Sequence, residues 1–163
     1  MPELKRISHV EFSVTDCDRA ATWWHDVMGF TEVHRARHDS FENRDLIHPT
    51  GMSVAVKTHD EPLSLSFDER CIGLDHISFE IADRDEMQCW LTHLDAMGVA
   101  HSGIKETALG PLVVFRDPDN IQVELFVHPS PEQVMALLNN ADSAEAQQAV
   151  REIGQLLTDA EDS

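Results

Sequence analysis

Two stretches of the sequence, ISHVEFSV at Ile7–Val14 and LDHISFEI at Leu74–Ile81, match almost position for position. Polar and apolar residues alternate in both, which is the pattern of a β-strand with one apolar face. Each stretch has a histidine at the same place, and a short acidic turn follows it, Thr15-Asp16 in the first copy and Ala82-Asp83 in the second. A pattern that returns in this way indicates an internally duplicated fold.

A helical segment follows each of these strands. Apolar residues recur at spacings of three and four from Asp18 to Met28 and from Asp85 to Met97, and each segment ends at a glycine, Gly29 or Gly98. Aspartate near the start of a helix and glycine just past its end fit the chemistry of helix caps. We therefore predict two amphipathic helices, whose tryptophans pack against a sheet.

Matching turns and strands also close the two halves. The turn former HPTG precedes the alternating stretch Met52–His59, and DPDN precedes Ile121–His128. Proline fixes φ in such turns, and glycine or asparagine tolerates left-handed backbone. Each half is therefore predicted to form a strand, a helix and two or three further strands, with Thr58–Gly73 as the linker.

The predicted fold is α+β, with tandem βαβββ modules at about residues 5–59 and 72–128 forming a curved mixed sheet around a concave site. Together they make one domain over residues 1–129. A strong helix start at Ser130-Pro131-Glu132 and two later apolar stripes predict a C-terminal helical extension over residues 130–163.

The composition excludes several classes of partner. With 12 basic and 30 acidic side chains the formal charge is −18, which repels nucleic acid and anionic membranes. Neither a signal peptide nor a long apolar run is present, and the three cysteines lack the spacing of a disulfide framework or a zinc knuckle. We expect a cytoplasmic protein that binds a small molecule, without nucleic acid or membrane partners.

Side chains two apart on a strand share a face, so each predicted strand has one apolar and one polar side. The helices need an apolar surface to cover, which leaves the polar sides facing away from them. One lone histidine there is more often structural, but His9 and His76 occupy equivalent places and Glu124 lies on the matching face of the last strand. We therefore predict a divalent metal site made of these three residues.

The residues also resemble a known family. The motifs ISHV, GLDHISF at Gly73–Phe79 and FRDPDNIQVEL at Phe115–Leu125, with a Trp23-Trp24 helix ending in Met28-Gly29-Phe30, are similar to those of the vicinal oxygen chelate superfamily. This superfamily is also called the glyoxalase, bleomycin-resistance and dioxygenase fold. The resemblance covers about residues 5–128.

The resemblance implies four metal positions, on the first and last strand of each module, which here are His9, Ala55, His76 and Glu124. Two imidazoles and one carboxylate can hold Fe, Mn, Zn or Ni with open coordination positions. The ion would act as a Lewis acid on a substrate that chelates it through two oxygen atoms.

The chain also departs from the family pattern. Ala55 stands where isomerases of the glyoxalase I type often have a glutamate that binds metal and takes a proton, so an isomerase is less favoured. The His, His, Glu set is similar to that of extradiol dioxygenases and fosfomycin-modifying enzymes. However, the chain has no tyrosine, and Glu11 stands where the fosfomycin enzymes tend to have threonine. A lyase or isomerase, a dioxygenase and a transferase all stay open.

Three functions remain as alternatives. The first is a metal-dependent enzyme, in which Glu124 binds the metal and an acid or base comes from Glu11, Glu80, His59 or His128. The second is a non-catalytic protein that sequesters an antibiotic or metabolite, with Trp23, Phe41 and Phe126 as stacking surfaces. The third is a metal-stabilised interaction domain. The family habit and the extra C-terminal helices favour a homodimer, with modules either paired within one chain or exchanged between two.

Substrate choice is expected to depend on a loop from about Glu32 to Ile47. The basic residues of this segment, in an acidic protein, include Arg35, Arg37, His38 and Arg44. They could attract an anionic substrate, but a solvated loop is the favoured interpretation.

Overall fold

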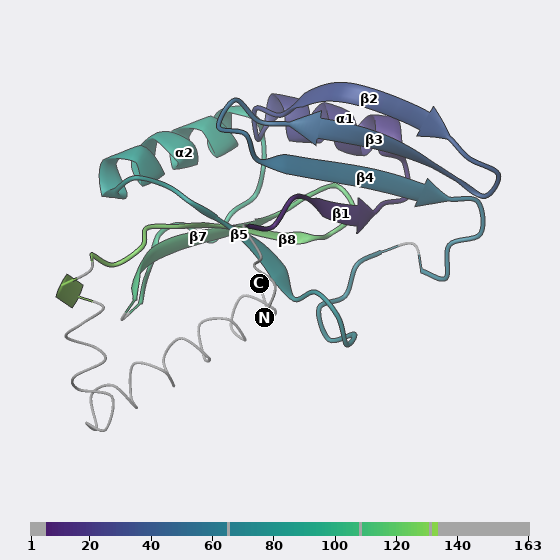
Figure 1. The fold of residues 1–163 in the computed structure, drawn as a ribbon. Coiled ribbons are helices and arrows are strands. Elements are labelled where there is room, and N and C mark those ends of the chain that lie inside the picture. Colours follow the sequence, from purple (N-terminus) through teal and green to yellow (C-terminus); the bar gives the residue numbers. More distant parts are fainter. Residues whose placement is uncertain (1–5, 65, 108, 131, 134–163) are drawn as a thin grey trace, which may run out of the picture. The chain divides into compact units, whose positions relative to one another are not determined.

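The computed structural model describes residues 6–64, 66–107, 109–130 and 132–133 of the chain. Two successive β-α-β-β-β series make up this part (Figure 1). The first consists of β1 (Val10–Ser13), α1 (Cys17–Asp26), β2 (Thr31–Arg37), β3 (Phe41–Ile47) and β4 (Ser53–His59). The second consists of β5 (His76–Glu80), α2 (Arg84–Ala96), β6 (Lys105–Thr107), β7 (Gly110–Arg116) and β8 (Gln122–Phe126). The predicted α+β fold of βαβββ modules is confirmed.

Helix α1 begins after Asp16, whose carboxylate accepts a hydrogen bond of 3.0 Å from the backbone N–H of Arg19. Its buried side includes Trp24, which stacks on Phe12 of β1 with ring centroids 5.6 Å apart. Replacing a buried tryptophan by alanine typically costs about 3–5 kcal/mol, so this contact anchors the helix to the sheet. The face of the sheet that carries Phe12 is therefore the helix face.

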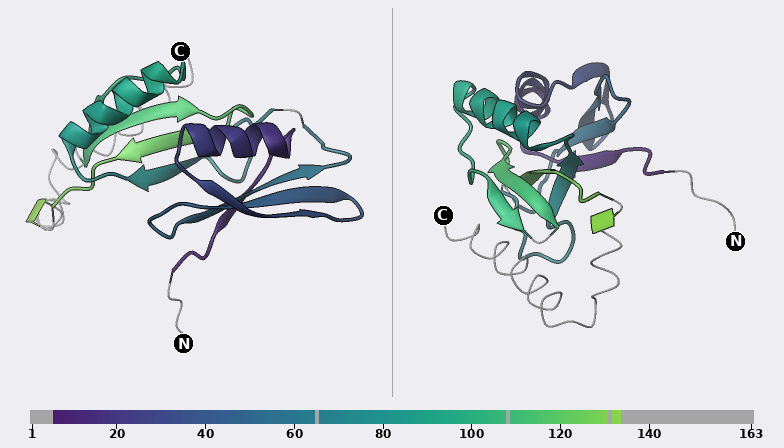
Figure 2. Two further views of the ribbon diagram at one scale, coloured as in Figure 1. Left: turned by 90° about the horizontal axis from the view of Figure 1, so that it is seen from above. Right: turned by 90° about the vertical axis from the view of Figure 1, so that its left-hand side faces the viewer.

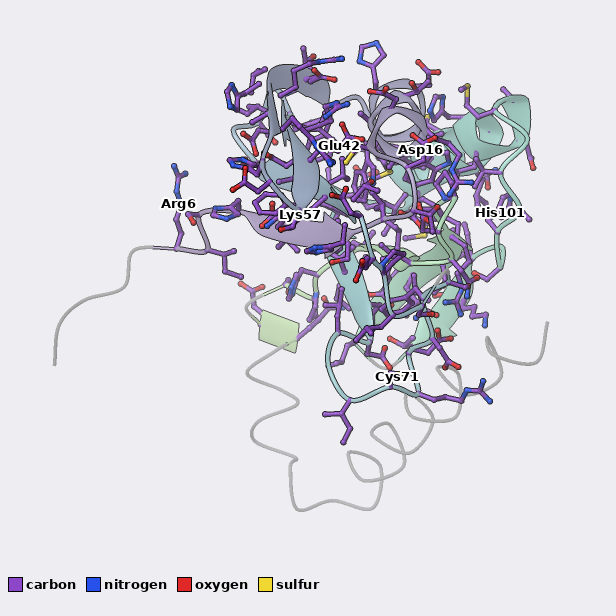
Figure 3. The ribbon with its side chains drawn as sticks, turned by 90° about the vertical axis from the view of Figure 1, so that its right-hand side faces the viewer. Arg6, Asp16, Glu42, Lys57, Cys71 and His101 are labelled. Carbon is purple, nitrogen blue, oxygen red and sulfur yellow. The ribbon has the colours of Figure 1, made fainter. Side chains whose placement is uncertain are left out.

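The first sheet has the strand order β1-β4-β3-β2, with β1 and β4 parallel and the other neighbours antiparallel. Helix α1 packs against β2, β3 and β4. The side chains that point away from it form what we call the first open face, and those used below are Glu11, Phe41, Asn43, Asp45, Ala55, Lys57 and His59. In Figure 3, Lys57 lies beside β1, whereas Glu42 lies toward Asp16 at the start of α1.

The second sheet repeats this plan with the order β5-β8-β7-β6 and a parallel β5–β8 pair. Helix α2 begins after Asp83, buries Met87 and Leu94, and runs along one side of the sheet (Figure 2). Phe79 and Leu125 are paired across β5 and β8 and are buried. The residues that alternate with them, including His76, Ser78 and Glu124, form the second open face.

Backbone contacts divide the chain into two compact units. Unit 1 contains Met1–Asp68 and the turn Asp117–Ile121, and unit 2 contains Glu69–Arg116 and Gln122–Ser163. The turn between β7 and β8 therefore belongs with the first module rather than with the strands it connects. In this turn Asn120 has a φ of 69°, a conformation that asparagine tolerates, as the DPDN motif predicted.

The prediction of a solvated loop from Glu32 to Ile47 is wrong. Strands β2 and β3 fill this segment and pair in antiparallel register, with a bulge between Glu32 and His34. Arg44 is buried on the helix face, where its guanidinium lies 3.0 Å from the Asp18 carboxylate and 3.2 Å from that of Glu42. The alternation of polar and apolar residues that marks a strand is hidden here, because the helix face carries arginines paired with carboxylates in place of apolar residues.

Three further expectations concern the cysteines, the C-terminal helices and membrane-spanning segments. Cys17, Cys71 and Cys89 are free, and burial raises the pKa of the Cys17 thiol, so this buried cysteine is less reactive than an exposed one. The predicted C-terminal helical extension over residues 130–163 lies outside the described residues apart from Ser130, Glu132 and Gln133. In the part that the structure describes, neither helix is long and apolar enough to cross a membrane.

Candidate metal centre

Two of the three predicted ligands lie together on the second open face. In the parallel register of β5 and β8, His76 stands opposite Gln122 and Ser78 stands opposite Glu124, so the histidine and the glutamate are diagonal neighbours. The Nε2 atom of His76 lies 4.0 Å from Oε1 of Glu124. This distance is too long for a direct hydrogen bond. The two atoms face each other, and each of them can bind a cation.

The other ring nitrogen of His76 is held by its neighbour in the chain. Its Nδ1 atom lies 2.6 Å from Oδ1 of Asp75, and because a carboxylate only accepts, Nδ1 carries the proton. When the imidazole is neutral, Nε2 then has the free lone pair that points toward Glu124. Histidines that bind metals commonly show this arrangement, with the second nitrogen donating to a carboxylate.

Glu124 is fixed by a different neighbour. Its side chain is almost completely buried, and Ser78 Oγ donates a hydrogen bond of 2.6 Å to Oε1. A buried carboxylate needs hydrogen bonds or a cation to offset the loss of water. Among the described residues Ser78 is the one recorded donor to this carboxylate, which has capacity for a further partner.

The third predicted ligand, His9, belongs to unit 1 and directly precedes β1. It is exposed, and its Nδ1 atom lies 3.0 Å from the hydroxyl of Ser8. The hydroxyl of Ser8 thus occupies the place that the carboxylate of Asp75 has beside His76. For both histidines the preceding residue is the hydrogen-bond partner of Nδ1, which leaves Nε2 for another partner.

The fourth position, Ala55, is buried in the middle of the first open face. Its neighbours across the sheet are Glu11 on β1 and Asp45 on β3, so two carboxylates flank the methyl group. Glu11 Oε2 lies 3.0 Å from Nζ of Lys57, and Asp45 Oδ1 accepts a hydrogen bond of 3.3 Å from Asn43 Nδ2. Position 55 thus lacks a carboxylate, but each of the two adjacent strands places one beside it.

A profile of the Glyoxalase/Bleomycin resistance protein/Dioxygenase superfamily matches residues 6–125. The chain belongs to this superfamily. Among curated proteins none matches the chain significantly.

Solved structures show the same superfamily fold. A glyoxylase/bleomycin resistance protein/dioxygenase domain from Frankia sp. EAN1pec is 30% identical, with a TM-score of 0.73 over 78% of this chain and 100% of that one. The fosfomycin resistance protein FosX from Listeria monocytogenes is 18% identical, with a TM-score of 0.65 over 82% of this chain and 99% of that one. FosX from Mesorhizobium loti is 20% identical, with a TM-score of 0.61 over 82% of this chain and 99% of that one.

Three other candidate acids and bases lie at or just beyond the ends of strands. Glu80 is exposed at the end of β5, and His128 is exposed beyond β8, where its ring meets Phe126 edge-on at 5.2 Å. His59 ends β4 and its ring lies 6.0 Å from that of Phe41. Their catalytic roles stay predictions.

Within the described residues, no group of three or more His, Cys, Asp or Glu side chains is gathered closely enough to hold a metal. The structure brings together His76 and Glu124 in unit 2, and His9 lies in unit 1, so the convergence of all three stays a prediction. Sequence reasoning missed Asp75 and Ser8, the partners of the two Nδ1 atoms. A polar residue directly before each repeated histidine was the available signal.

Proposed function

We propose that this chain is a divalent-metal-dependent enzyme that acts on a small molecule with two neighbouring oxygen atoms, with His9, His76 and Glu124 as the metal ligands. One observation carries the proposal: Nε2 of His76 faces Oε1 of Glu124 at 4.0 Å while Nδ1 is tied to Asp75. Two lone-pair donors at this distance can both bind a cation placed between them, whereas they cannot form a hydrogen bond with each other.

The chemistry of the donor set fits the expected group of metals. Two imidazole nitrogens and one carboxylate suit Fe, Mn, Zn or Ni and leave coordination positions for substrate. When bound, the ion would supply Lewis-acid polarisation of the substrate oxygens. The FosX structure with Mn(II) and a dihydroxypropylphosphonic acid supports such use of a divalent metal in this fold.

The chain's own residues would orient the ligands and manage the proton. Asp75 holds the His76 ring through Nδ1, which leaves Nε2 for the metal, and Ser78 holds the Glu124 carboxylate in place. Among the predicted acids and bases, Glu11 lies on β1 two residues after His9 and is bound by Lys57. This makes Glu11 our first candidate for proton transfer at the substrate.

The experiment is metal analysis of the full chain purified without a histidine tag and then supplied in turn with Fe, Mn, Ni and Zn. We expect about one equivalent of one metal in the original protein, and a loss of at least about tenfold in His76→Ala and in Glu124→Gln, because each removes a ligand. His101→Ala is the matched control, since His101 also pairs with an aspartate, Asp95, at 3.1 Å but has no glutamate partner among the described residues. Cys89→Ala is a second control.

Equal metal content in His76→Ala and His101→Ala would refute the ligand assignment. Absence of metal in the original protein under all four conditions would refute metal dependence. If metal binds and no turnover is found with oxygen-chelating substrates, the alternative of a sequestering protein takes the place of the enzyme. Turnover is tested with catechols, α-keto acids and thiol adducts, and binding with a thermal-shift screen that includes antibiotics.

A further inference from the structure

Two buried carboxyl groups lie close together in the turn between β7 and β8. Asp117 is 5% exposed and Asp119 is 6% exposed. The backbone N–H of Asp119 donates a hydrogen bond of 2.9 Å to Oδ1 of Asp117, and both residues belong to unit 1. Burying a charged carboxylate is costly unless it is paired and hydrogen-bonded, so the partners of each oxygen decide where the negative charge is best placed.

Asp117 is held through one of its two oxygens. Oδ1 accepts hydrogen bonds from the backbone N–H groups of Asp119 and, at 2.8 Å, of Ile121. Oδ2 is buried and has no hydrogen-bond partner among the described residues. The donors to this carboxyl group are therefore neutral, and they all meet the same oxygen.

Asp119 has a stronger set of partners. Its Oδ1 atom accepts from the backbone N–H of Thr15 at 2.9 Å and from the Thr15 hydroxyl, and the Arg19 guanidinium lies 3.0 Å away. Its Oδ2 atom is also buried without a partner in the described part of the chain. Hydrogen bonds between charged groups stabilise a carboxylate more than neutral donors do. Asp119 is therefore the better place for the negative charge.

A proton on Asp117 removes the conflict between the two groups. A neutral carboxyl group loses less on burial than a carboxylate does. Burial, and to a smaller extent the charge of Asp119, raises the pKa of Asp117 to about 6, although its two backbone hydrogen bonds and the charge of Arg19 oppose this rise. Because two N–H groups already occupy Oδ1, the place for the proton is Oδ2.

The turn that contains these carboxyl groups holds two other segments of unit 1. Oδ1 of Asp119 binds Thr15, which lies between β1 and α1, 104 positions away in the chain. The backbone oxygen of Asp119 accepts from the N–H of Phe67 at 3.0 Å, and Nδ2 of Asn120 donates to the backbone oxygen of Phe67 at 3.0 Å. We call these hydrogen bonds to Thr15 and Phe67 the turn clasp.

We propose that Oδ2 of Asp117 is a proton-binding site whose occupancy closes and opens the turn clasp. With the proton bound, the pair has one negative charge, which the donors to Asp119 stabilise, and the clasp is closed. When the proton leaves to solvent, two like charges are buried in one turn. Opening the turn lets water reach both carboxylates and breaks the bonds to Thr15 and Phe67. This inference goes beyond the proposed function, because neither metal nor substrate takes part in it.

The clasp should weaken as the pH rises through about 6, since the closed turn binds the proton more tightly than the open turn. The experiment measures amide hydrogen exchange by NMR in the full chain, freed of metal with a chelator, at about pH 5 and about pH 7.5. After correction for the intrinsic effect of pH on exchange, the protection of the Thr15 and Phe67 amides should be about tenfold lower at the higher pH.

Two variants test whether Asp117 is the group responsible. Asp117→Asn keeps an acceptor for the backbone N–H groups but cannot bind the proton, so the protection of Thr15 and Phe67 should change by less than about twofold between the two pH values. Asp83→Asn is the matched control. Asp83 also accepts a backbone N–H, from Glu86 at 2.9 Å, but it is exposed, so this variant should respond to pH as the original chain does.

Three results would overturn the proposal. The first is an equal fall in protection in Asp117→Asn and the original chain, or no fall in the original. The second concerns Val14, whose N–H donates to the backbone oxygen of Lys57 at 2.8 Å. Equal protection of Val14 and Thr15 at the higher pH would mean that the clasp opens only when the whole unit unfolds.

The third result needs no variant. A side-chain carbon NMR spectrum of the original chain should show the Asp117 carboxyl group protonated at about pH 5 and ionised at about pH 7.5. A carboxylate that is already ionised at the lower pH would exclude the proton site.

Discussion

At the scale of single residues, two buried carboxylates show how their surroundings decide what each can do. Glu124 is 6% exposed and Asp117 is 5% exposed. Glu124 accepts a hydroxyl hydrogen bond and faces an imidazole. Asp117 accepts the backbone N–H groups of Asp119 and Ile121 through Oδ1, while its Oδ2 has no partner among the described residues. Burial, with a smaller effect of the nearby Asp119 charge, raises the pKa of Asp117 to about 6.

Asp117 should therefore make the protein less stable as the pH rises. Because its folded pKa of about 6 lies above the ordinary value of 3.8, the folded chain binds this proton more tightly than the unfolded chain. The resulting stability is fully present below the ordinary pKa and is lost as the pH rises through the folded pKa. Its upper limit is about 3 kcal/mol.

The variant Asp117→Asn keeps the acceptor for the two backbone groups and cannot ionise. Urea unfolding at about pH 4.5 and about pH 7.5 should show the variant gaining about 2 kcal/mol on the original protein at the higher pH. An unchanged difference between the two proteins at both pH values would show that Asp117 is not the group responsible.

At the scale of elements, the repeat carried most of the predictive power. Each strand-helix start was located from a pattern present twice, and the observed caps, Asp16 and Asp83, are the last residues of the two predicted acidic turns. The β2–β3 hairpin was missed because Arg35, Arg37 and Arg44 look like loop residues. Their ion pairs with Glu32, Asp60 and Asp18 are contacts that a linear pattern does not display.

Gly110 is an element-level requirement that the sequence did not reveal. It begins β7 with a φ of 138°, and a Cβ atom there would overlap the backbone oxygen of Val127. Gly110→Ala should therefore lower the free energy of unfolding by about 3 kcal/mol, through both backbone strain and overlap with the strand end. Chemical denaturation measures this loss.

Gly103→Ala is the matched control. Gly103 has a φ of 69°, but a Cβ atom there would meet no atom within 4 Å, so only the backbone cost of about 1–2 kcal/mol applies. Equal losses in the two variants would show that the close approach to Val127 does not matter.

At the scale of the whole molecule, the sequence predicted which side chains share a face better than it predicted their contacts. The pairing of His76 with Glu124 follows from strand alternation and the repeat. By the same rule Glu11 and Lys57 lie on one face. Their contact could not be predicted from the sequence, because it depends on the parallel β1–β4 register. The assignment of the turn Asp117–Ile121 to unit 1 depends on contacts between residues far apart in the chain, which no local pattern displays.

Asp119 is one of the residues that tie this turn to the rest of unit 1, together with Asn120, whose Nδ2 donates to the backbone oxygen of Phe67. Its Oδ1 atom accepts hydrogen bonds from the backbone N–H of Thr15 at 2.9 Å, although the two residues are 104 positions apart, and from the Thr15 hydroxyl. The guanidinium of Arg19 approaches the same oxygen to 3.0 Å, and the backbone oxygen of Asp119 accepts from Phe67. Unit 1 is therefore completed by a residue that arrives late in the chain.

Removing the Asp119 carboxylate should lower the free energy of unfolding far more than removing the Arg19 cation that faces it. Asp119→Ala leaves the Thr15 N–H without its acceptor, so we expect a loss of about 2–3 kcal/mol in the free energy of unfolding. Arg19→Ala removes only a half-exposed partner of the same oxygen and should cost less than about 1 kcal/mol. Urea denaturation compares the two, and equal losses would mean that the ion pair, rather than the bonds to Thr15, holds the turn in unit 1.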